Sequence, residues 1–155
     1  MLIFETIFPS PLWDLHAVAN DTHLIELRYA DEKRCSHQDD CETSILAQTR
    51  KELSEYFNGK RETFSIPLSP EGTEFQKKAW KALEKIPYGE TRSYKEEAIL
   101  AWNPKAVRAI GWANNKNPIV VIIPCHRVIW ADGKLVGYGG GIERKKWLLE
   151  HEKKK

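Results

Sequence analysis

The sequence contains few of the residues that build disulfide frameworks or membrane spans. It has three cysteines and one methionine among 155 residues, too few thiols for the disulfide network of a small secreted domain. No apolar run approaches the roughly 20 residues that cross a bilayer, and no basic region precedes the apolar residues at the N-terminus. We therefore expect a cytoplasmic protein without a signal peptide or a membrane anchor.

Motifs for phosphate and metal binding are also missing. The glycine run Gly139–Gly141 is not followed by Lys-Ser or Lys-Thr and lacks the GxGxxG spacing, which excludes a phosphate-binding loop. Cys35, His37 and Cys41 follow no standard zinc spacing, and no fourth ligand is evident near them. We expect neither a bound metal nor a small-molecule cofactor.

Charge is divided unevenly along the chain. Residues 1–70 carry 7 Lys+Arg against 12 Asp+Glu, a net charge of −5, whereas residues 71–155 carry 17 against 10, a net charge of +7. A basic half beside an acidic half indicates that only the C-terminal half meets a polyanion such as nucleic acid. A solvated lysine surface would give the same count.

Hydrophobic periodicity in the first 70 residues predicts a small α/β scaffold. It predicts, in order, strands over 1–8, 13–19 and 23–29, a helix over 44–58 and a short strand over 64–68. Asn20-Asp21-Thr22 suits a hairpin turn between the second and third strands. None of these residues looks catalytic, and the stretch 68–72 predicts a linker.

The remaining residues predict a mostly helical domain. Two capping boxes, Thr73–Gln76 and Ser93–Glu96, begin helices in which the N-cap and the fourth residue bind each other's backbone. Asn103 and Pro104 predict a further helix over 104–114, because asparagine is a good N-cap and proline suits the first helical position. A last helix is predicted over 143–152.

The second and third of these helices are joined by a turn of three residues. The third carries Lys105 and Arg108 on one face, three residues apart. This arrangement is typical of a DNA-binding helix-turn-helix, although any helical hairpin gives the same spacing.

The candidate nucleophile is Cys125. The β-branched run Ile119–Ile123 predicts a strand buried on both faces, and Pro124 ends it. Cys125 and His126 follow at once, and a thiol beside a base on a rigid support suits nucleophilic catalysis. The alternative is a buried core cysteine with a hydrogen-bonded histidine as its neighbour.

Activation of this thiol needs a base or a cation that lowers its pKa. Neighbouring residues on a strand point to opposite faces, so either the backbone turns after Pro124 or a water carries the proton from Cys125 to His126. His151 and Glu152 are both able to orient His126, and the sequence does not choose between them.

Motifs along the whole C-terminal half resemble those of one family. Ile123-Pro-Cys-His-Arg-Val128 is similar to the active-site signature of the O6-alkylguanine-DNA alkyltransferases, or methylated-DNA–protein-cysteine methyltransferases. Further segments in that family's order and spacing are Phe75-Gln76…Trp80, Ile86–Thr91, Ser93-Tyr94, Asn103-Pro104…Arg108…Gly111, Asn117-Pro118, Gly137-Tyr138…Gly140-Gly141 and Trp147–Glu152. The resemblance covers nearly all of residues 71–155 and extends weakly to 56–60.

The resemblance implies an α/β fold with two domains. A small ribonuclease-H-like N-terminal domain, residues 1–70, would precede a mostly helical winged helix-turn-helix domain, residues 71–155. It also implies a monomer that repairs double-stranded DNA containing alkylated guanine. By the same resemblance, the damaged base would be flipped out, and the alkyl group would pass from guanine O6, or less readily from thymine O4, to the cysteine. Each molecule acts once.

Matched positions imply roles in the reaction. Cys125 would be the acceptor, activated by His126 and Glu152 with a water between thiol and imidazole. Asn117 would brace the strand and the turn. Tyr94 would help to rotate the nucleotide and would donate a proton to the leaving base.

Other matched positions imply contacts with DNA and with the flipped base. Arg108 would fill the place that the base leaves in the stack, and the residues that would contact DNA are Tyr94, Lys95, Asn103, Lys105, Ala106 and Arg108. Val128, Tyr138 and Gly139 would line the base pocket, and Gly139 stands where some members carry serine. Trp102, Trp112 and Trp130 have no assigned role beyond packing.

Two other functions fit parts of the pattern. A lesion-binding module or winged-helix regulator needs no acceptor cysteine, whereas Cys125 is present. A Cys-His hydrolase needs no helix-turn-helix and would turn over repeatedly.

Overall fold

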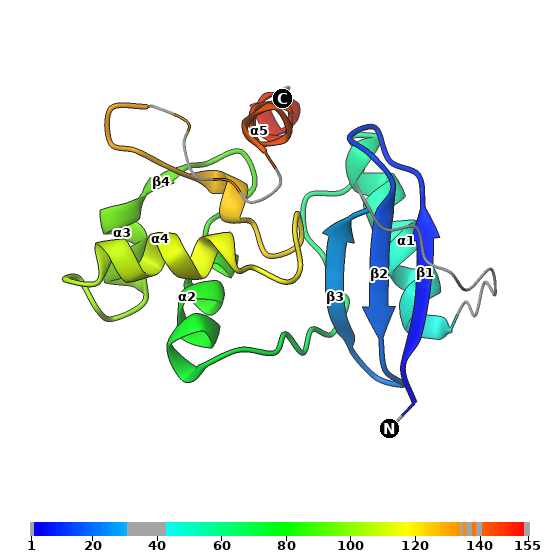
Figure 1. Ribbon diagram of the computed structural model, residues 1–155. Helices are drawn as coiled ribbons and strands as arrows, with labels where there is room; N and C mark the ends of the chain where they lie inside the picture. The colour runs from blue at the N-terminus through cyan, green and yellow to red at the C-terminus, as the bar shows by residue number, and fades with distance from the viewer. Residues whose placement is uncertain (1, 31–42, 134, 136–137, 139–140, 154–155) are drawn as a thin grey trace. The chain divides into compact units, whose positions relative to one another are not determined.

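The computed structural model describes residues 2–30, 43–133, 135, 138 and 141–153, and it divides the chain into two compact units, Met1–Glu71 and Gly72–Lys155. The first unit combines a sheet with a helix, and the second is mostly helical (Figure 1). Within the described ranges, no helix has the length and apolar character needed to cross a membrane.

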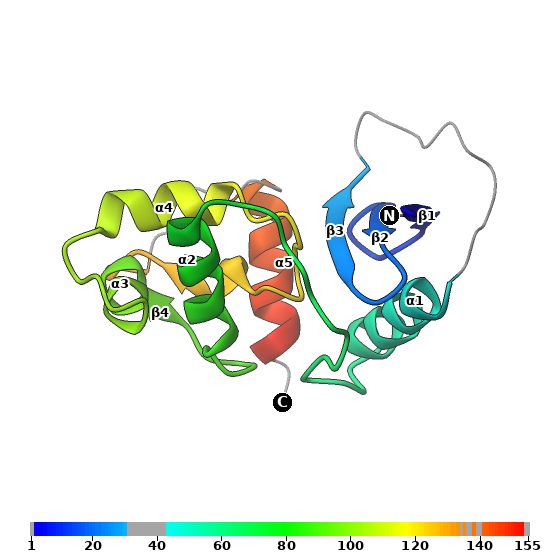
Figure 2. The same ribbon diagram turned by 90° about the horizontal axis from the view of Figure 1, so that it is seen from below.

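The first unit is a three-stranded antiparallel sheet covered by one helix. Strands β1 (Phe4–Phe8), β2 (Leu15–Ala19) and β3 (Leu24–Tyr29) pair in that order. Helix α1 (Ser44–Phe57) lies against one face of the sheet (Figures 1 and 2). The predicted hairpin is confirmed, because the Asn20 side chain accepts hydrogen bonds from the backbone of Thr22 and His23 at 2.9 and 2.7 Å.

The predicted strand over 64–68 is wrong. Only an isolated parallel bridge joins Leu24 to Leu68, with the amide of Leu24 donating to the carbonyl of Pro67 at 2.8 Å. Pro67 has no N–H to give to a ladder, which limits the pairing to this single bridge. Cys35, His37 and Cys41 lie outside the described residues.

Both predicted capping boxes of the second unit are confirmed. Thr73 and Gln76 begin α2 (Glu74–Glu84), and Ser93 and Glu96 begin α3 (Tyr94–Leu100). Helix α4 (Val107–Asn115) is tied to α2 by the indole of Trp80, which donates to the carbonyl of Ala113 at 2.9 Å. These three helices form the main framework of the unit (Figure 2).

The predicted helix start at Asn103 is wrong. The amide of Asn103 bonds the carbonyl of Ala98 at 2.9 Å, and the amide of Trp102 bonds that of Ile99 at 3.0 Å. This is the bond pattern of a Schellman motif, with Trp102 in the left-handed conformation at φ 62°. Asn103 is therefore used to end α3, and α4 begins only after Ala106, which has no side-chain cap.

The predicted buried strand over 119–123 is a buried turn. The amide of Ile123 bonds the carbonyl of Ile119 at 3.1 Å, and Val121 has φ 70°. A positive φ is strained for a β-branched residue and persists only where the surroundings enforce it. Asn117 does so, because its side chain accepts from the amide of Ile119 at 3.0 Å and donates to the carbonyl of Ile123 at 2.8 Å.

The chain continues from this turn into the short 3₁₀ helix η1 (Cys125–Arg127) and strand β5 (Val128–Ile129). Strand β5 pairs in parallel with β4 (Arg92–Ser93), the two residues before α3. Helix α5 (Ile142–Lys153) packs against η1 and buries Lys145, Leu148 and Glu152. Trp147 and His151 are only half-buried and stack on each other with ring centroids 4.9 Å apart.

Candidate active site

The thiol of Cys125 lies at the first residue of η1, directly after the buried turn. Cys125 is buried, with 6% of its surface exposed. The side-chain amide of Asn117 donates to the sulfur over 3.2 Å and to the carbonyl of Ile123 over 2.8 Å. The same side chain that imposes the turn therefore also holds the sulfur in place.

The resting thiol is not acidic. Burial raises the pKa of Cys125 to about 11, although the hydrogen bond from Asn117 and the charge of Lys145 act to lower it. The sulfur is therefore protonated near neutral pH, and a nearby base has to take its proton before it attacks.

The base beside it is His126, held by Glu152. The Nε2 of His126 lies 2.7 Å from Oε2 of Glu152, and both side chains are buried. Arg127 binds both oxygens of the same carboxylate, since its Nε donates to Oε1 at 2.8 Å and its Nη2 donates to Oε2 at 3.1 Å. Its Nη1 donates to the carbonyl of Ile86 at 2.7 Å, which anchors the pair to the end of α2.

These contacts decide between the two candidates for orienting His126. Glu152 makes the contact, whereas His151 stacks on Trp147. Burial alone would raise the pKa of Glu152, but His126 and Arg127 outweigh it and hold that pKa well below 4.5. Burial lowers the pKa of His126. The carboxylate is thus ionised beside a neutral imidazole.

The opposite nitrogen of His126 is the one able to accept a proton. Glu152 binds Nε2 and fixes the proton there, because an ionised carboxylate only accepts hydrogen bonds. Nδ1 is buried without a hydrogen-bond partner. The imidazole therefore presents a basic lone pair inside the protein, one residue from the thiol.

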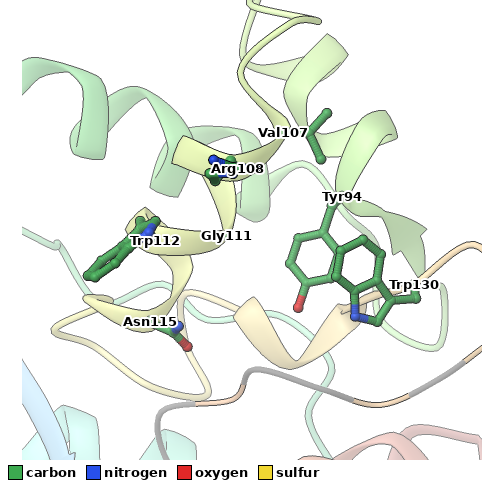
Figure 3. Close-up of a pocket in the computed structure, with 7 residues that line it drawn as sticks. All are labelled: Tyr94, Val107, Arg108, Gly111, Trp112, Asn115 and Trp130. Atoms are coloured by element: carbon green, nitrogen blue, oxygen red, sulfur yellow. The ribbon is translucent and has the colours of Figure 1, made fainter.

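A pocket of about 530 Å³ opens beside α4 (Figure 3). Tyr94 and Trp130 lie together on one side, with ring centroids 4.9 Å apart. Figure 3 shows Trp112 on α4 across the pocket from this pair. The other residues that line it are Val107, Arg108, Gly111 and Asn115.

Tyr94 belongs both to this pocket and to the surroundings of Cys125. It is 7% exposed, and burial raises its pKa, to which Glu97 and Cys125 add once they are ionised. Cys125 itself is not among the lining residues. Arg108 lies in the first turn of α4 and is exposed.

The remaining predicted residues divide between surface and core. Lys95 on α3 and Asn103 and Lys105 in the turn before α4 are exposed, and Ala106 is half-buried at the start of α4. The residues predicted to line the base pocket are Val128 and Tyr138, both buried, and Gly139, which lies outside the described residues. In the part of the chain that the structure describes, no group of three His, Cys, Asp or Glu side chains is arranged to hold a metal ion.

Sequence reasoning missed three residues of the site, Arg127, Trp112 and Trp130. The expectation that Trp102, Trp112 and Trp130 serve only in packing is wrong, because all three are exposed. Arg127 follows Cys125 and His126 directly in the chain, but its partner Glu152 is 25 residues away, and the sequence gives no sign of this contact. Trp112 follows Arg108 by four residues, so its place on the same exposed face of a helix was predictable. Nothing in the sequence indicates that the Trp130 ring packs against Tyr94.

Comparison with family models matches both units. Residues 74–154 match the model described as "6-O-methylguanine DNA methyltransferase, DNA binding domain", and residues 3–70 match "6-O-methylguanine DNA methyltransferase, ribonuclease-like domain". The chain is 45% identical over 155 residues to a methylated-DNA–protein-cysteine methyltransferase of Methanosarcina mazei, covering 97% of each chain. It is 56% identical over 108 residues to that of Methanosarcina barkeri, covering 70% of this chain and 68% of the relative.

Solved structures agree with these matches. The O6-methylguanine methyltransferase of Mycobacterium tuberculosis is similar with a TM-score of 0.87 and 42% identity, over 98% of this chain and 93% of that one. The crystal structure of OGT from the same organism in complex with DNA is similar with a TM-score of 0.86 and 45% identity, over 95% and 91% of the two chains.

Proposed function

Because the chain belongs to the 6-O-methylguanine DNA methyltransferase family, we propose that it repairs DNA by moving the alkyl group of O6-alkylguanine to Cys125. The observation that carries this proposal is the buried arrangement of Cys125, His126 and Glu152. It supplies a nucleophile, a base and an orienting carboxylate in a domain whose family model is named for DNA binding.

The reaction is a displacement at carbon. The Cys125 proton passes through one water to Nδ1 of His126, and Glu152 stabilises the imidazolium that forms. The sulfur then bonds to the alkyl carbon as the bond from that carbon to O6 breaks. The electron pair leaves with the guanine, which takes a proton from Tyr94. The thioether product is stable, so each molecule reacts once.

Asn117 has two functions in this scheme. Its amide hydrogen bond to the sulfur favours the thiolate over the thiol, because a donor stabilises the charged form. Its bonds to Ile119 and Ile123 keep the sulfur fixed while the charge develops. Preorganised donors of this kind need no rearrangement during the reaction.

DNA contact is assigned to α3, α4 and the turn between them. The target atom lies inside the duplex, so the nucleotide has to be extruded at a cost of a few kcal/mol. Arg108, which is exposed and lines the pocket, would fill the gap in the stack. Other contacts with the DNA would come from Lys95, Asn103, Lys105 and Ala106. Repair of a lesion needs no sequence readout, so phosphate contacts should dominate and salt should weaken binding.

The two domains would have separate roles. Residues 1–70 would serve as the scaffold domain, and residues 71–155 as the DNA-binding and alkyl-acceptor domain. The protein would act in the cytoplasm as a monomer without a cofactor. Thymine alkylated at O4 would be a slower substrate than O6-alkylguanine.

Intact-protein mass spectrometry tests this function. The protein is incubated with duplex DNA containing one O6-methylguanine, weighed and then digested to find the modified residue. We expect the mass of one methylene to be added, with the methyl group on Cys125, and no gain for Cys125→Ala. Binding without any mass gain would favour the lesion-binding module, and repeated ester or peptide cleavage would favour the hydrolase.

A further inference from the structure

A second buried carboxyl lies near the reactive thiol and has no part in the proton transfer from Cys125 to His126. Glu97 on α3 is fully buried, and Asn114 on α4 donates to its Oε1 over 2.6 Å. Glu97 follows Tyr94 by three residues and precedes Ala101 by four, a spacing that places it on the inward face of α3. It thereby ties the two helices of the helix-turn-helix together from inside.

The hydrogen bonds of this pair are incomplete if Glu97 is a carboxylate. Its Oε2 is buried without a hydrogen-bond partner, and so is Oδ1 of Asn114. Both atoms are acceptors, and an unsatisfied buried acceptor costs about 1–3 kcal/mol. A single proton removes both deficits at once, because Oε2–H can then donate to the Asn114 oxygen while the Asn114 amide donates to Oε1.

We propose that Glu97 is a positioning residue for the reaction proposed above, kept as a neutral carboxylic acid in a cyclic acid–amide pair with Asn114. Burial supports this protonation state, since it raises the pKa of Glu97 to about 8 even against the Asn114 hydrogen bond and the charge of Lys145. At neutral pH the pair therefore carries no net charge.

Neutrality matters because of what surrounds Glu97. The charged or titratable neighbours are Tyr94 on the same helix, Cys125 on η1 and Lys145 on α5. The positive charge of Lys145 lowers the pKa of Cys125, whereas an ionised Glu97 would raise it. With Glu97 protonated, the lysine acts on the sulfur unopposed and thiolate formation is easier.

Titration of the wild-type carboxyl tests the protonation state without any DNA. Protein labelled with ¹³C at the glutamate side-chain carboxyls is followed by NMR from pH 4 to pH 9, and the signal of Glu97 is identified by its loss in Glu97→Gln. We expect this signal to titrate with a midpoint near 8. A midpoint below 5 would overturn the acid–amide pair, even if alkyl transfer to Cys125 were established.

The rate at which iodoacetamide alkylates Cys125 tests the effect on the sulfur. Glu97→Gln keeps the pair neutral at every pH. We expect it to react within about twofold of wild type below pH 7 and up to about tenfold faster above pH 8.5, where ionised Glu97 raises the pKa of the thiol in the wild type. Glu150→Gln, an exposed substitution on α5, should follow wild type throughout.

Equal alkylation of Glu97→Gln and wild type across this range would refute the positioning role. A faster reaction of Glu97→Gln already at pH 6 would show a carboxylate in the wild type and would refute the neutral pair. Both readouts are independent of DNA, so failure of the repair function in the mass measurement is a separate result.

Discussion

The buried carboxyl of Glu97 should make the protein's stability depend on pH in a direction opposite to that of most acidic groups. Its pKa is raised by burial from 4.5 to about 8. As pH rises above 4.5, the unfolded chain releases this proton while the folded chain keeps it. The unfolded state therefore binds fewer protons, and the free energy of unfolding falls until the pH passes about 8.

The magnitude follows from the size of this shift. One pKa unit corresponds to about 1.4 kcal/mol, and pH 7 lies 2.5 units above 4.5, so the loss at pH 7 is about 3 kcal/mol. Glu97→Gln cannot titrate and should not show it. The free energy of unfolding of Glu97→Gln should therefore rise by about 3 kcal/mol relative to wild type between pH 4.5 and pH 7.

Urea denaturation at a series of pH values measures this difference. Tryptophan fluorescence reports mainly on the second unit, because five of the six tryptophans lie in it. Subtracting the variant from wild type cancels the other titrating groups, and Glu150→Gln shows the effect of losing an exposed glutamate. A difference that stays constant within about 0.5 kcal/mol from pH 4.5 to pH 7 would refute the reasoning.

Three further substitutions test the rest of the site. Arg127→Met should destabilise the protein by about 3–5 kcal/mol in urea denaturation, because Glu152 would stay buried without its main cation. A loss below about 1 kcal/mol would show that the contact between Arg127 and Glu152 contributes little to stability. Asn117→Ala should cost about 2–4 kcal/mol through three lost hydrogen bonds and should slow alkylation of Cys125 by iodoacetamide, whereas unchanged alkylation would contradict its role at the sulfur. Arg108→Ala should slow methyl transfer from duplex DNA about tenfold or more and leave unfolding unchanged, and an equal rate would exclude a role in extrusion.

Controls separate the DNA effect of Arg108 from general loss of charge. Arg28→Ala removes an exposed arginine from β3 in the first unit and should leave transfer unchanged. Free O6-methylguanine as substrate needs no extrusion, so Arg108→Ala should react with it at the wild-type rate. Slower transfer from the free base as well would mean that Arg108 acts on the chemistry.

Local signals in the sequence predicted much of the fold. The capping boxes at Thr73 and Ser93 and the hairpin at Asn20 depend on hydrogen bonds within a few residues, and all three are confirmed. The predictions over 103–104 and 119–123 failed for one reason. In each case a backbone or side-chain bond with a nearby residue competed with the regular element and was stronger than the propensity that suggested it.

Within the site, too, groups that are close in the sequence were predictable, whereas contacts between distant residues were not. The thiol, the imidazole and the amide of Asn117 lie within ten residues, and the structure brings the Asn117 amide against the Cys125 sulfur. By contrast, Arg127 binds Glu152, which is 25 positions away. Glu97 likewise pairs with Asn114, 17 positions away. Such contacts depend on how the helices pack, and no short motif records them.

A single alkyl transfer should consume Cys125. Counting the methyl groups removed from DNA per protein molecule tests this most directly, as O6-methylguanine duplex is raised to a large excess. We predict a plateau at one methyl group per chain, all of it on Cys125 and none removed by Cys125→Ala. Repair that continues past one group per chain, or a plateau of zero for folded wild-type protein, would contradict the claim.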